Sequence, residues 1–579
     1  MSSPYFRSMA EAFLASCGIR LEPVDAWYSI SAPDGSLAAG AGIKGNVIKC
    51  VAVDDRYRGE GLLPRLVSHI ISLHQGENLR VFTKPEYSPL FEDLGFKLLA
   101  QAPEAVLLEN GRGLDDYCRY LEGRGYYPQN RRFATPPING PLPFRECISP
   151  YCPQGDILPF GVRPRVAPGS GDNTPVHTPD IGVIVMNANP FTRGHRYLVE
   201  KALERVESLV IIPVKEDAQE FTYEERREMI RKGCEGLPVT VAEGSDYSIS
   251  ALTFPTYFLK DLSKAAETQM RLDLDLFGRH IVPALKADVR FVGTEPDDKL
   301  TARYNALMKE ILPIPVVEVE RLEGVSASKV RSAKYPDAAA MTPESTHPYL
   351  LARLIEKALL AELDTPMKPG LVGPDGNGAH ADMDYDMMKR GAAAIRRSFT
   401  ANIGLLPDIT AFGKAIEADV LAVTGGVNTH RGAIFALGLM AVAALQKRNI
   451  AALAAGLKQP EGTHGAAARG AKGALKMAQG GYSELREDWL PLYRSLEGDP
   501  FRMQKTLLKI MSTLDDTCVI HRAGESRAKE IKADAAFLLG HFGEKSLQEM
   551  NERLCAARVS PGGSADMLAL TVLADKLLT

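Results

Sequence analysis

Two proline-rich stretches divide this sequence and limit what each part can fold into. Prolines and glycines cluster from Pro136 to Pro179, and a second break lies between Tyr335 and Pro348. The chain has 579 residues, and because single hydrophobic cores stop growing at roughly 250–300 residues, it must form several domains. We expect an α/β domain at 1–135, a linker at 136–179, a second α/β domain at 180–335, a linker at 336–347 and an all-helical domain at 348–579.

Charge and composition exclude some classes of partner. The formal net charge of −4 offers no long-range attraction for a polyanion, so nucleic acid is not expected as a partner. No segment reaches the roughly 20 apolar residues that span a bilayer, and the longest, from Gly432 to Leu445, indicates a buried helix. The first residues lack an export signal, and the eight cysteines are scattered without metal-binding spacing. We therefore expect a cytoplasmic protein with reduced thiols and no membrane partner.

The first segment has the pattern of an α/β domain with a basic turn. A strand is expected at 46–53, followed by Arg56, Gly59 and Gly61 and then a helix at about 62–73. Such a turn points backbone N–H groups at an anion. The spacing resembles the pyrophosphate-binding turn of GNAT acyltransferases, and Phe91-x-x-x-Gly95-Phe96 resembles the end of that fold. Because no general base presents itself, a GNAT-like module without catalysis, docking a carrier's pantetheine arm, is the alternative.

The second segment predicts a parallel, Rossmann-like sheet. A short buried strand at 181–186 leads into a loop at 187–195, a helix to about Val206 and a further strand at 209–214. This order places a site at the carboxyl end of the strands.

Two motifs of this segment suit nucleotide phosphates. Thr192-x-Gly194-His195 combines close backbone approach with a histidine at a helix start, which can donate a hydrogen bond to an α-phosphate. About 135 residues further on, Ser326, Ser328 and Arg331 form a second anion cradle after an expected strand at 316–319. A lone histidine after a strand is often only structural, but both motifs in this order indicate adenylyl or nucleotidyl transfer.

The stretch MNANPFTRGHRYLVEKAL, with Arg290-Phe291-Val292-Gly293 and VSASKVR, resembles citrate lyase ligase over residues 1–335. The resemblance implies that acetate attacks the α-phosphate of ATP and that the acetyl-adenylate acylates the thiol of the citrate lyase acyl carrier subunit. It also implies Mg²⁺. The residues it assigns to the nucleotide are Asn189, Thr192, Gly194, His195, Ser326, Ser328 and Arg331, with His195 and Arg331 catalytic. Tyr247, Ser250 and Lys260 match by resemblance only, and packing is their alternative role.

Beyond the second break the sequence is rich in Ala and Leu, which indicates a helical domain. Polar clusters recur at the expected helix starts: 378–384, 424–432 preceded by Glu417, 515–522 and 560–566. Helix capping is the usual role of Asp, Ser and Thr there. Four clusters that also contain His and Arg favour a ligand site. If a helix started at Ala381, Asp382 and Asp386 would share one face and could present carboxylates to Mg²⁺.

The stretches GAHADMD, TGGVNTHRGAIF, GTHG and SPGGSADMLALT resemble triphosphoribosyl-dephospho-CoA synthase over residues 346–579. The resemblance implies that the 2′-hydroxyl of 3′-dephospho-CoA displaces adenine from ATP. Our candidates for acid and base, left unassigned between them, are His380, Asp382, Glu417 and His430. Phosphate contacts are expected from Gly425, Gly426, Asn428, Arg431, Arg522, Gly562 and Gly563.

Two positions depart from the pattern of that family. The chain has Gly373-Pro374-Asp375-Gly376-Asn377 where the family carries Asp-Arg-x-Asn, and Arg431 where it carries Lys. Either Asp375 and Asn377 act from shifted positions or this half is impaired.

Two rival interpretations stay open. One is a small-molecule nucleotidyltransferase with a helical regulatory tail, and the other is a non-enzymatic factor that binds an acyl carrier protein. A malonate decarboxylase cofactor pathway would use a similar synthase, but the ligase half argues against it.

Overall fold

The computed structural model describes residues 4–123, 180–216, 219–248, 264–294, 299–458 and 473–578. The predicted linker at 136–179, Ser250, Lys260 and the GTHG stretch at 462–465 lie outside these ranges. The chain forms two compact units. The first comprises 1–188, 195–227 and 234–323, and the second comprises 189–194, 228–233 and 324–579.

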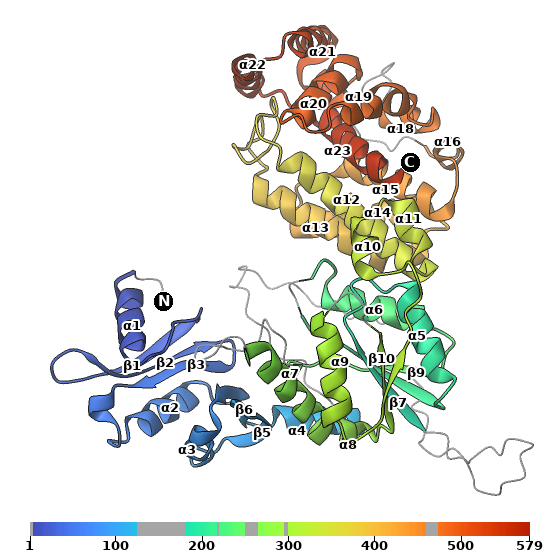
Figure 1. Cartoon of the computed structure of the whole chain (residues 1–579). Helices are drawn as coiled ribbons and strands as arrows, with labels where there is room; N and C mark the ends of the chain where they lie inside the picture. Colours follow the sequence, from blue (N-terminus) through green and yellow to red (C-terminus); the bar gives the residue numbers. More distant parts are fainter. Residues whose placement is uncertain are drawn as a thin grey trace, which may run out of the picture. The chain divides into compact units, whose positions relative to one another are not determined.

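The first unit begins with a mixed six-stranded sheet in the order β1-β2-β3-β4-β6-β5 (Figure 1). Its strands are β1 (Ala26–Ser31), β2 (Leu37–Lys44), β3 (Val47–Val53), β4 (Leu79–Thr83), β5 (Lys97–Ala102) and β6 (Ala105–Asn110). Its helices are α1 (Pro4–Ser16), α2 (Leu62–Leu73), α3 (Ser88–Glu92) and α4 (Gly113–Leu121), with short 3₁₀ turns η1 (Asp55–Tyr57) and η2 (Pro85–Tyr87). Only β3 and β4 pair in parallel. Strand β3 and helix α2 confirm the expected strand and helix, because Leu66, Val67 and Ile70 bury one face of α2 in the core.

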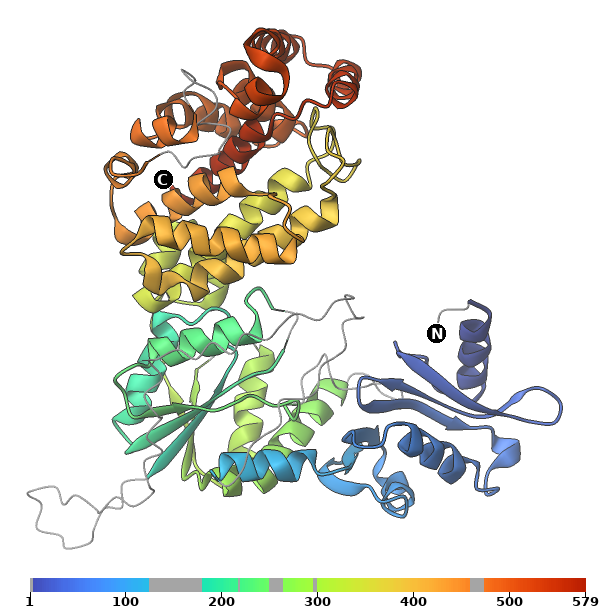
Figure 2. The ribbon, with the colours of Figure 1, turned by 180° about the vertical axis from the view of Figure 1, so that it is seen from behind.

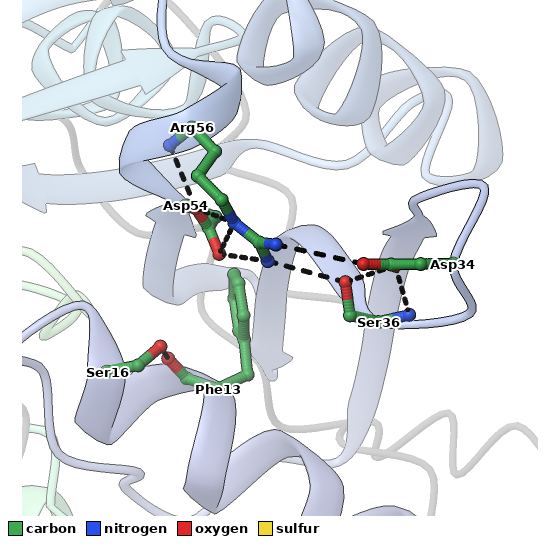
Figure 3. Close-up of polar contacts among 6 residues, drawn as sticks. All are labelled: Phe13, Ser16, Asp34, Ser36, Asp54 and Arg56. Carbon is green, nitrogen blue, oxygen red and sulfur yellow. Dashed lines mark hydrogen bonds and ion pairs between the residues drawn. The ribbon is translucent and has the colours of Figure 1, made fainter.

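The arginine of the basic turn between β3 and α2, Arg56, forms ion pairs with two carboxylates (Figure 3). Arg56 Nη2 lies 2.9 Å from Asp54 Oδ2, and its backbone N–H donates to Asp54 Oδ1 at 2.9 Å. Its guanidinium also reaches Ser36 Oγ at 3.4 Å and Asp34 Oδ2 at 3.7 Å. The positive charge of Arg56, which was expected to bind an anion, is therefore already paired with two aspartates.

The second sheet of the same unit has the order β11-β10-β7-β8-β9, and every pair of neighbours is parallel. Its strands are β7 (Ile181–Met186), β8 (Ser208–Pro213), β9 (Val239–Val241), β10 (Val289–Gly293) and β11 (Val316–Val319). The connecting helices are α5 (Arg193–Leu203), α6 (Tyr223–Gly233), α7 (Ala265–Leu276), η4 (Phe277–Ile281), α8 (Val282–Leu285) and α9 (Lys299–Ile311). The predicted parallel α/β sheet is confirmed, with β7 at its centre.

The two sheets of the first unit share a core. Phe82, Leu107 and Tyr117 pack in one apolar cluster with Val183 and Leu272. Tyr247 is buried there, its hydroxyl donates to Glu109, and its ring stacks on Tyr117 with centroids 6.3 Å apart. Tyr247 therefore has the packing role that was the alternative for it.

The second unit is helical over its described residues from 324 onward, seen from behind in Figure 2. Its α-helices are α10 (Ala327–Ser332), α11 (Tyr335–Ala340), α12 (His347–Leu363), α13 (Tyr385–Ala401), α14 (Ile409–Val423), α15 (Arg431–Gln446), α16 (Ile450–Ala454), α18 (Ala474–Gln479), α19 (Leu490–Ser495), α20 (Arg502–Thr513), α21 (Thr517–Gly540), α22 (Glu544–Ala556) and α23 (Gly562–Leu577). Shorter turns are η5 (Glu344–Thr346), η6 (Ile403–Leu405) and η7 (Leu485–Trp489). Helices α15 and α23 are buried along most of their length, and α23 packs against α12, α15, α20 and α21. This confirms α15 as a buried helix.

Residues 336–347, expected to form a linker, are helical and partly buried. They span α11, η5 and the start of α12, and Thr342 and Thr346 are fully buried. Thr346 Oγ1 donates to the carbonyl of Phe191 at 3.1 Å. Its proline-containing sequence therefore begins helices rather than separating domains, because proline is tolerated in a first turn. No helix in the described ranges is long and apolar enough to cross a membrane.

Candidate functional sites

The loop after β7 packs its predicted nucleotide residues against α10. Asn189 and Thr192 are buried, and Arg331 donates to the carbonyl of Asn189 and, at 3.2 Å, to Ser328 Oγ. Ser326 caps α10 by accepting from the backbone N–H of Lys329 at 3.1 Å. The structure therefore joins Arg331 and Ser328 to the loop, whereas Ser326 serves as a cap.

Gly194 and His195 lie in the first turn of α5, which begins at Arg193. An added Cβ at Gly194 would lie 3.4 Å from Thr192 Oγ1, about an ordinary contact distance. Burial and the positive charge of Arg321 lower the pKa of His195 to about 4. The imidazole is therefore neutral at neutral pH and has one N–H to donate.

Arg226 on α6 was missed by sequence reasoning. Its side chain is fully buried and donates to the carbonyls of Val214 at 2.9 Å and Glu216 at 2.8 Å. It also holds both oxygens of Asn187, at 2.9 and 2.6 Å. This one guanidinium thus joins the ends of β7 and β8 beside the loop. No local pattern distinguishes it from the neighbouring arginines of a charged helix.

In the helical unit, His380 lies at the centre of the predicted polar clusters. Its Nε2 is 2.9 Å from Ser560 Oγ, and its Nδ1 is 3.5 Å from Arg522 Nη2 and 3.6 Å from Asp382 Oδ1. Burial, and then the charge of Arg522, lower the pKa of His380, against the opposing effect of Asp382. Three of the four clusters meet here.

Asp516 ties the starts of α21 and α23 together. Its carboxylate accepts from the backbone N–H of Cys518 at 2.9 Å, and from the backbone N–H and hydroxyl of Ser564 at 2.7 and 2.9 Å. The backbone N–H of Gly563 reaches it at 3.3 Å. The N–H of Gly563 is thus already bonded to a carboxylate and helps to hold the two helix starts together. A phosphate contact of Gly563 stays a prediction.

The cluster before α15 is arranged in a similar way. Arg431 forms an ion pair with Glu417, and its backbone N–H donates to Asn428 Oδ1 at 3.2 Å. Both Gly425 and Gly426 have positive φ, 67° and 87°, which favours glycine in this exposed turn.

His430 is buried beside this turn, and burial lowers its pKa to about 4. Its Nδ1 lies 2.7 Å from Thr429 Oγ1, and the ring leaves no room for a side chain at Gly391. His430 is therefore neutral at neutral pH and closely packed.

The predicted metal pair does not form on a helix face. Asp384 caps α13, accepting from the N–H of Met387 at 2.7 Å, so the helix starts at Tyr385 and Asp382 precedes it. Asp382 and Asp386 are both exposed. Within the described ranges, no group of three His, Cys, Asp or Glu side chains is arranged to hold a metal ion.

The segment that departs from the family pattern is a tight turn. Gly373 and Gly376 exchange backbone hydrogen bonds of 3.0 and 3.2 Å, and Asp375 accepts from the N–H of Met367 at 2.6 Å. Asp375 thus holds the turn itself. Nearby, Lys368 and Glu362 form a buried ion pair at 2.5 Å, which sequence analysis did not predict.

Comparison with known proteins places these sites in two families. Residues 181–350 match the family described as citrate lyase ligase C-terminal domain. Residues 348–467 and 456–579 match the family described as ATP:dephospho-CoA triphosphoribosyl transferase.

Relatives of each family align over most of their length. The citrate (pro-3S)-lyase ligase of Klebsiella pneumoniae is 36% identical over 367 residues, covering 60% of this chain and 92% of the relative. The 2-(5''-triphosphoribosyl)-3'-dephosphocoenzyme-A synthase of Stutzerimonas stutzeri is 36% identical over 264 residues, covering 39% of this chain and 91% of the relative. A solved pantothenate synthetase from Thermus thermophilus aligns with 32% of the chain and 68% of its own length at 14% identity, with a TM-score of 0.20.

These matches and the two sites define an ATP-using enzyme with two activities. The chain belongs to the citrate lyase ligase family in its first part and to the triphosphoribosyl-dephospho-CoA synthase family in its C-terminal part. It is a bifunctional enzyme of citrate lyase maturation, at once a ligase and a transferase.

Proposed function

We propose that residues 1–335 acetylate the citrate lyase acyl carrier subunit, with a Rossmann-like nucleotidyltransferase fold at 180–335. An acetate oxygen attacks the α-phosphorus of ATP and pyrophosphate leaves. The carrier thiol then attacks the acetyl-adenylate, and AMP leaves. The parallel sheet and the loop after β7 support this assignment, since such sheets bind ligands at the carboxyl ends of their strands.

The residues of the ligase half have distinct roles in this proposal. The neutral imidazole of His195 donates its N–H to charge that develops on the α-phosphate. Asn189, Thr192 and Gly194 position the nucleotide, and Arg331, with Ser326 and Ser328, binds the leaving pyrophosphate. The contact of Arg331 with the carbonyl of Asn189 supports this, because it places a cation directly at the loop.

The second activity belongs to residues 348–579. The 2′-hydroxyl of 3′-dephospho-CoA attacks C1′ of the ribose of ATP, and the bond from C1′ to adenine breaks. The single observation that carries this assignment is the meeting of His380, Ser560 and Arg522, which places a neutral base and a cation together. Arg522 and Arg431, with the turns at Gly425–Gly426 and Gly562–Gly563 and with Asn428, bind phosphates. His430, Glu417 and Asp382 remain the other acid–base candidates.

Mg²⁺ enters this scheme with the nucleotide. The described side chains do not form a ready-made cage for it. Mg²⁺ commonly binds through substrate phosphates and one or two carboxylates, and Asp382 and Asp386 are available for that role.

The carrier subunit is the expected protein partner of the first half. We assign the GNAT-like domain at 1–135 to docking the carrier's pantetheine arm rather than to catalysis. The engagement of Arg56 with Asp34 and Asp54 supports a structural role for its basic turn.

A paired experiment tests both activities in one preparation. The purified chain is incubated with Mg-ATP and 3′-dephospho-CoA, and mass spectrometry follows free adenine and the triphosphoribosyl adduct. Acetate-dependent exchange of labelled pyrophosphate into ATP follows the ligase. His380→Gln should abolish only adenine release, and His195→Gln should abolish only exchange.

Each variant serves as the activity control for the other half, and the urea unfolding curve of each variant should match that of the unmodified chain. Absence of adenine release from the unmodified, ATP-binding chain would leave a ligase with an inactive appendage. Absence of acetate-dependent exchange would favour a small-molecule nucleotidyltransferase instead.

A further inference from the structure

Asp566 is an acidic group at the synthase site that none of the roles above uses. It lies near the start of α23, and its carboxylate is in contact with the start of α15. A Cβ at Gly432 would overlap Asp566 Oδ2, so only glycine allows this approach. The backbone of Ala433 hydrogen-bonds to the carboxylate.

Like charges surround Asp566. One is Asp516 at the start of α21, and the other is Glu362 on α12. Glu362 is itself paired with Lys368. Burial, together with the charges of Asp516 and Glu362, raises the pKa of Asp566 well above its usual value. Asp566 therefore keeps its proton at a pH at which an ordinary aspartate is ionised.

The hydroxyl of Tyr482 is a second polar group of the helical unit that none of the roles above uses. The side chain is fully buried, and within the described residues its hydroxyl has no hydrogen-bond partner. Burial raises the pKa of Tyr482, so the hydroxyl remains a donor. A buried hydroxyl without a partner costs roughly 1–3 kcal/mol, which a bound polar group would recover.

Asp566 also lies near the residues of the proposed synthase site. The thiol of Cys518 lies within the influence of Asp516, Asp566 and Arg522 together. Arg522 in turn contacts His380. The carboxylate of Asp566 also lies against Gly432, the residue after Arg431, and Asp566 belongs to the same 560–566 cluster as Ser560, which contacts His380.

Breaking the bond between ribose and adenine requires an acid, because the purine leaves readily only when one of its ring nitrogens is protonated. We propose that Asp566 is the proton donor to the departing adenine, assisted by a hydrogen bond from Tyr482, an assignment that rests on the proposed synthase activity.

Each proton that moves in this step has a donor and an acceptor. The C1′–O bond to the 2′-oxygen forms as the C1′–N bond breaks. The proton of Asp566 goes to adenine, and the proton of the attacking hydroxyl goes to a base of the same site. Solvent then returns the proton to Asp566.

The test compares Asp566→Asn with the unmodified chain in single-turnover adenine release from ATP and 3′-dephospho-CoA. The asparagine keeps the shape and removes the acid, so release should fall by about 100- to 1000-fold. With N7-methylated ATP, whose base departs without protonation, the loss should shrink to less than tenfold. Asp534→Asn, at an exposed carboxylate paired with Arg553, is the matched control.

The pH profile separates an acid from a structural residue. Adenine release by the unmodified chain should fall as the pH rises through the pKa of Asp566, and this limb should vanish in Asp566→Asn. Tyr482→Phe should fold, keep the limb and lose about tenfold in rate, the effect of one hydrogen bond. Acetate-dependent pyrophosphate exchange should be unchanged in all variants, and the fluorescence of the buried Trp489 should be unchanged as well, which shows that the helical unit is folded.

Release by Asp566→Asn within threefold of the unmodified chain would overturn the assignment. An equal loss with ATP and its N7-methylated analogue, together with an unaltered pH profile, would also overturn it. If Asp566→Asn fails to fold, two other results together overturn the assignment. Tyr482→Phe would release adenine at an unchanged rate, and release by the unmodified chain would not fall at high pH. A chain that releases no adenine at all refutes the synthase activity itself, a separate outcome.

Discussion

The buried ion pair between Lys368 and Glu362 allows a quantitative test of the helical unit. The side chains are 1% and 8% exposed, and Lys368 Nζ lies 2.5 Å from Glu362 Oε1. At an effective dielectric constant near 20, their attraction is about 7 kcal/mol before the cost of removing both charges from water. Lys368→Met leaves the carboxylate buried alone, and such a loss typically costs about 3–5 kcal/mol.

The double variant should recover most of this loss. Lys368→Met combined with Glu362→Leu removes both buried charges at similar volume, a replacement that is often nearly neutral. The free energy of unfolding should therefore fall by about 3–5 kcal/mol in Lys368→Met and by about 1 kcal/mol or less in the double variant.

The chain provides a local reporter for this measurement. It contains two tryptophans, Trp27 and Trp489. Trp489 is fully buried in the helical unit, where its Nε1 donates to Thr513 Oγ1 at 2.9 Å. In a Trp27→Phe background, its fluorescence follows urea unfolding of this unit alone. A Lys368→Met change below about 1 kcal/mol, or a double variant as unstable as the single one, would refute the reasoning.

Four further predictions follow from the sites. His195→Ala should slow acetate-dependent pyrophosphate exchange by about 100- to 1000-fold without altering adenine release; equal losses in both assays would point to misfolding. Because His430 has a pKa of about 4 when folded and 6.5 as the reference value, unfolded chains take up its proton first as the pH falls. The unfolding free energy, followed by Trp489, should therefore drop by up to about 3 kcal/mol more than in His430→Gln between pH 6.5 and 4, and parallel curves would contradict this. Arg226→Met should destabilise the first unit by about 3 kcal/mol or more, measured by Trp27 fluorescence in a Trp489→Phe background, since several carbonyls lose their donor; a change under 1 kcal/mol would show that water replaces it. Asp382→Asn with Asp386→Asn should raise the Mg²⁺ concentration for half-maximal adenine release by about tenfold if either carboxylate contacts the metal, and an unchanged value would leave Mg²⁺ on the phosphates alone.

Local elements could be predicted from the sequence because their patterns are local. Strand β7 is a run of buried apolar residues, and α2 places Leu66, Val67 and Ile70 on one face. Both follow directly from periodicity. The parallel sheet also follows, because a helix between two strands returns the chain to the same edge and lets the strands pair in parallel.

Long-range polar contacts could not be predicted in the same way. Arg226 and Lys368 look like ordinary surface charges in the sequence, and only the fold buries them beside their partners. The start of α13 was misplaced because two aspartates, Asp382 and Asp384, closely precede it and either could cap the helix. The structure selects Asp384, which leaves Asp382 in the loop beside His380.

The helix starts also show why capping and ligand binding were difficult to separate. Asp516 caps α21 and binds the first turn of α23 with the same carboxylate. His380, one loop away, contacts Ser560 and Arg522 instead. Capping therefore accounts for Asp516, and ligand binding at His380 stays a prediction.

The packing of Phe191 determines where a gene of this kind can be split into two. Its ring is fully buried against Gly233, and its carbonyl accepts from Thr346. Two residues further on, the backbone N–H of Arg193 donates to the carbonyl of Met341 at 2.9 Å. A break in the reading frame after residue 335 would remove from the ligase product Met341 and Thr346, which bond the backbone of Arg193 and Phe191. A break just after Thr346 would leave these contacts with the ligase.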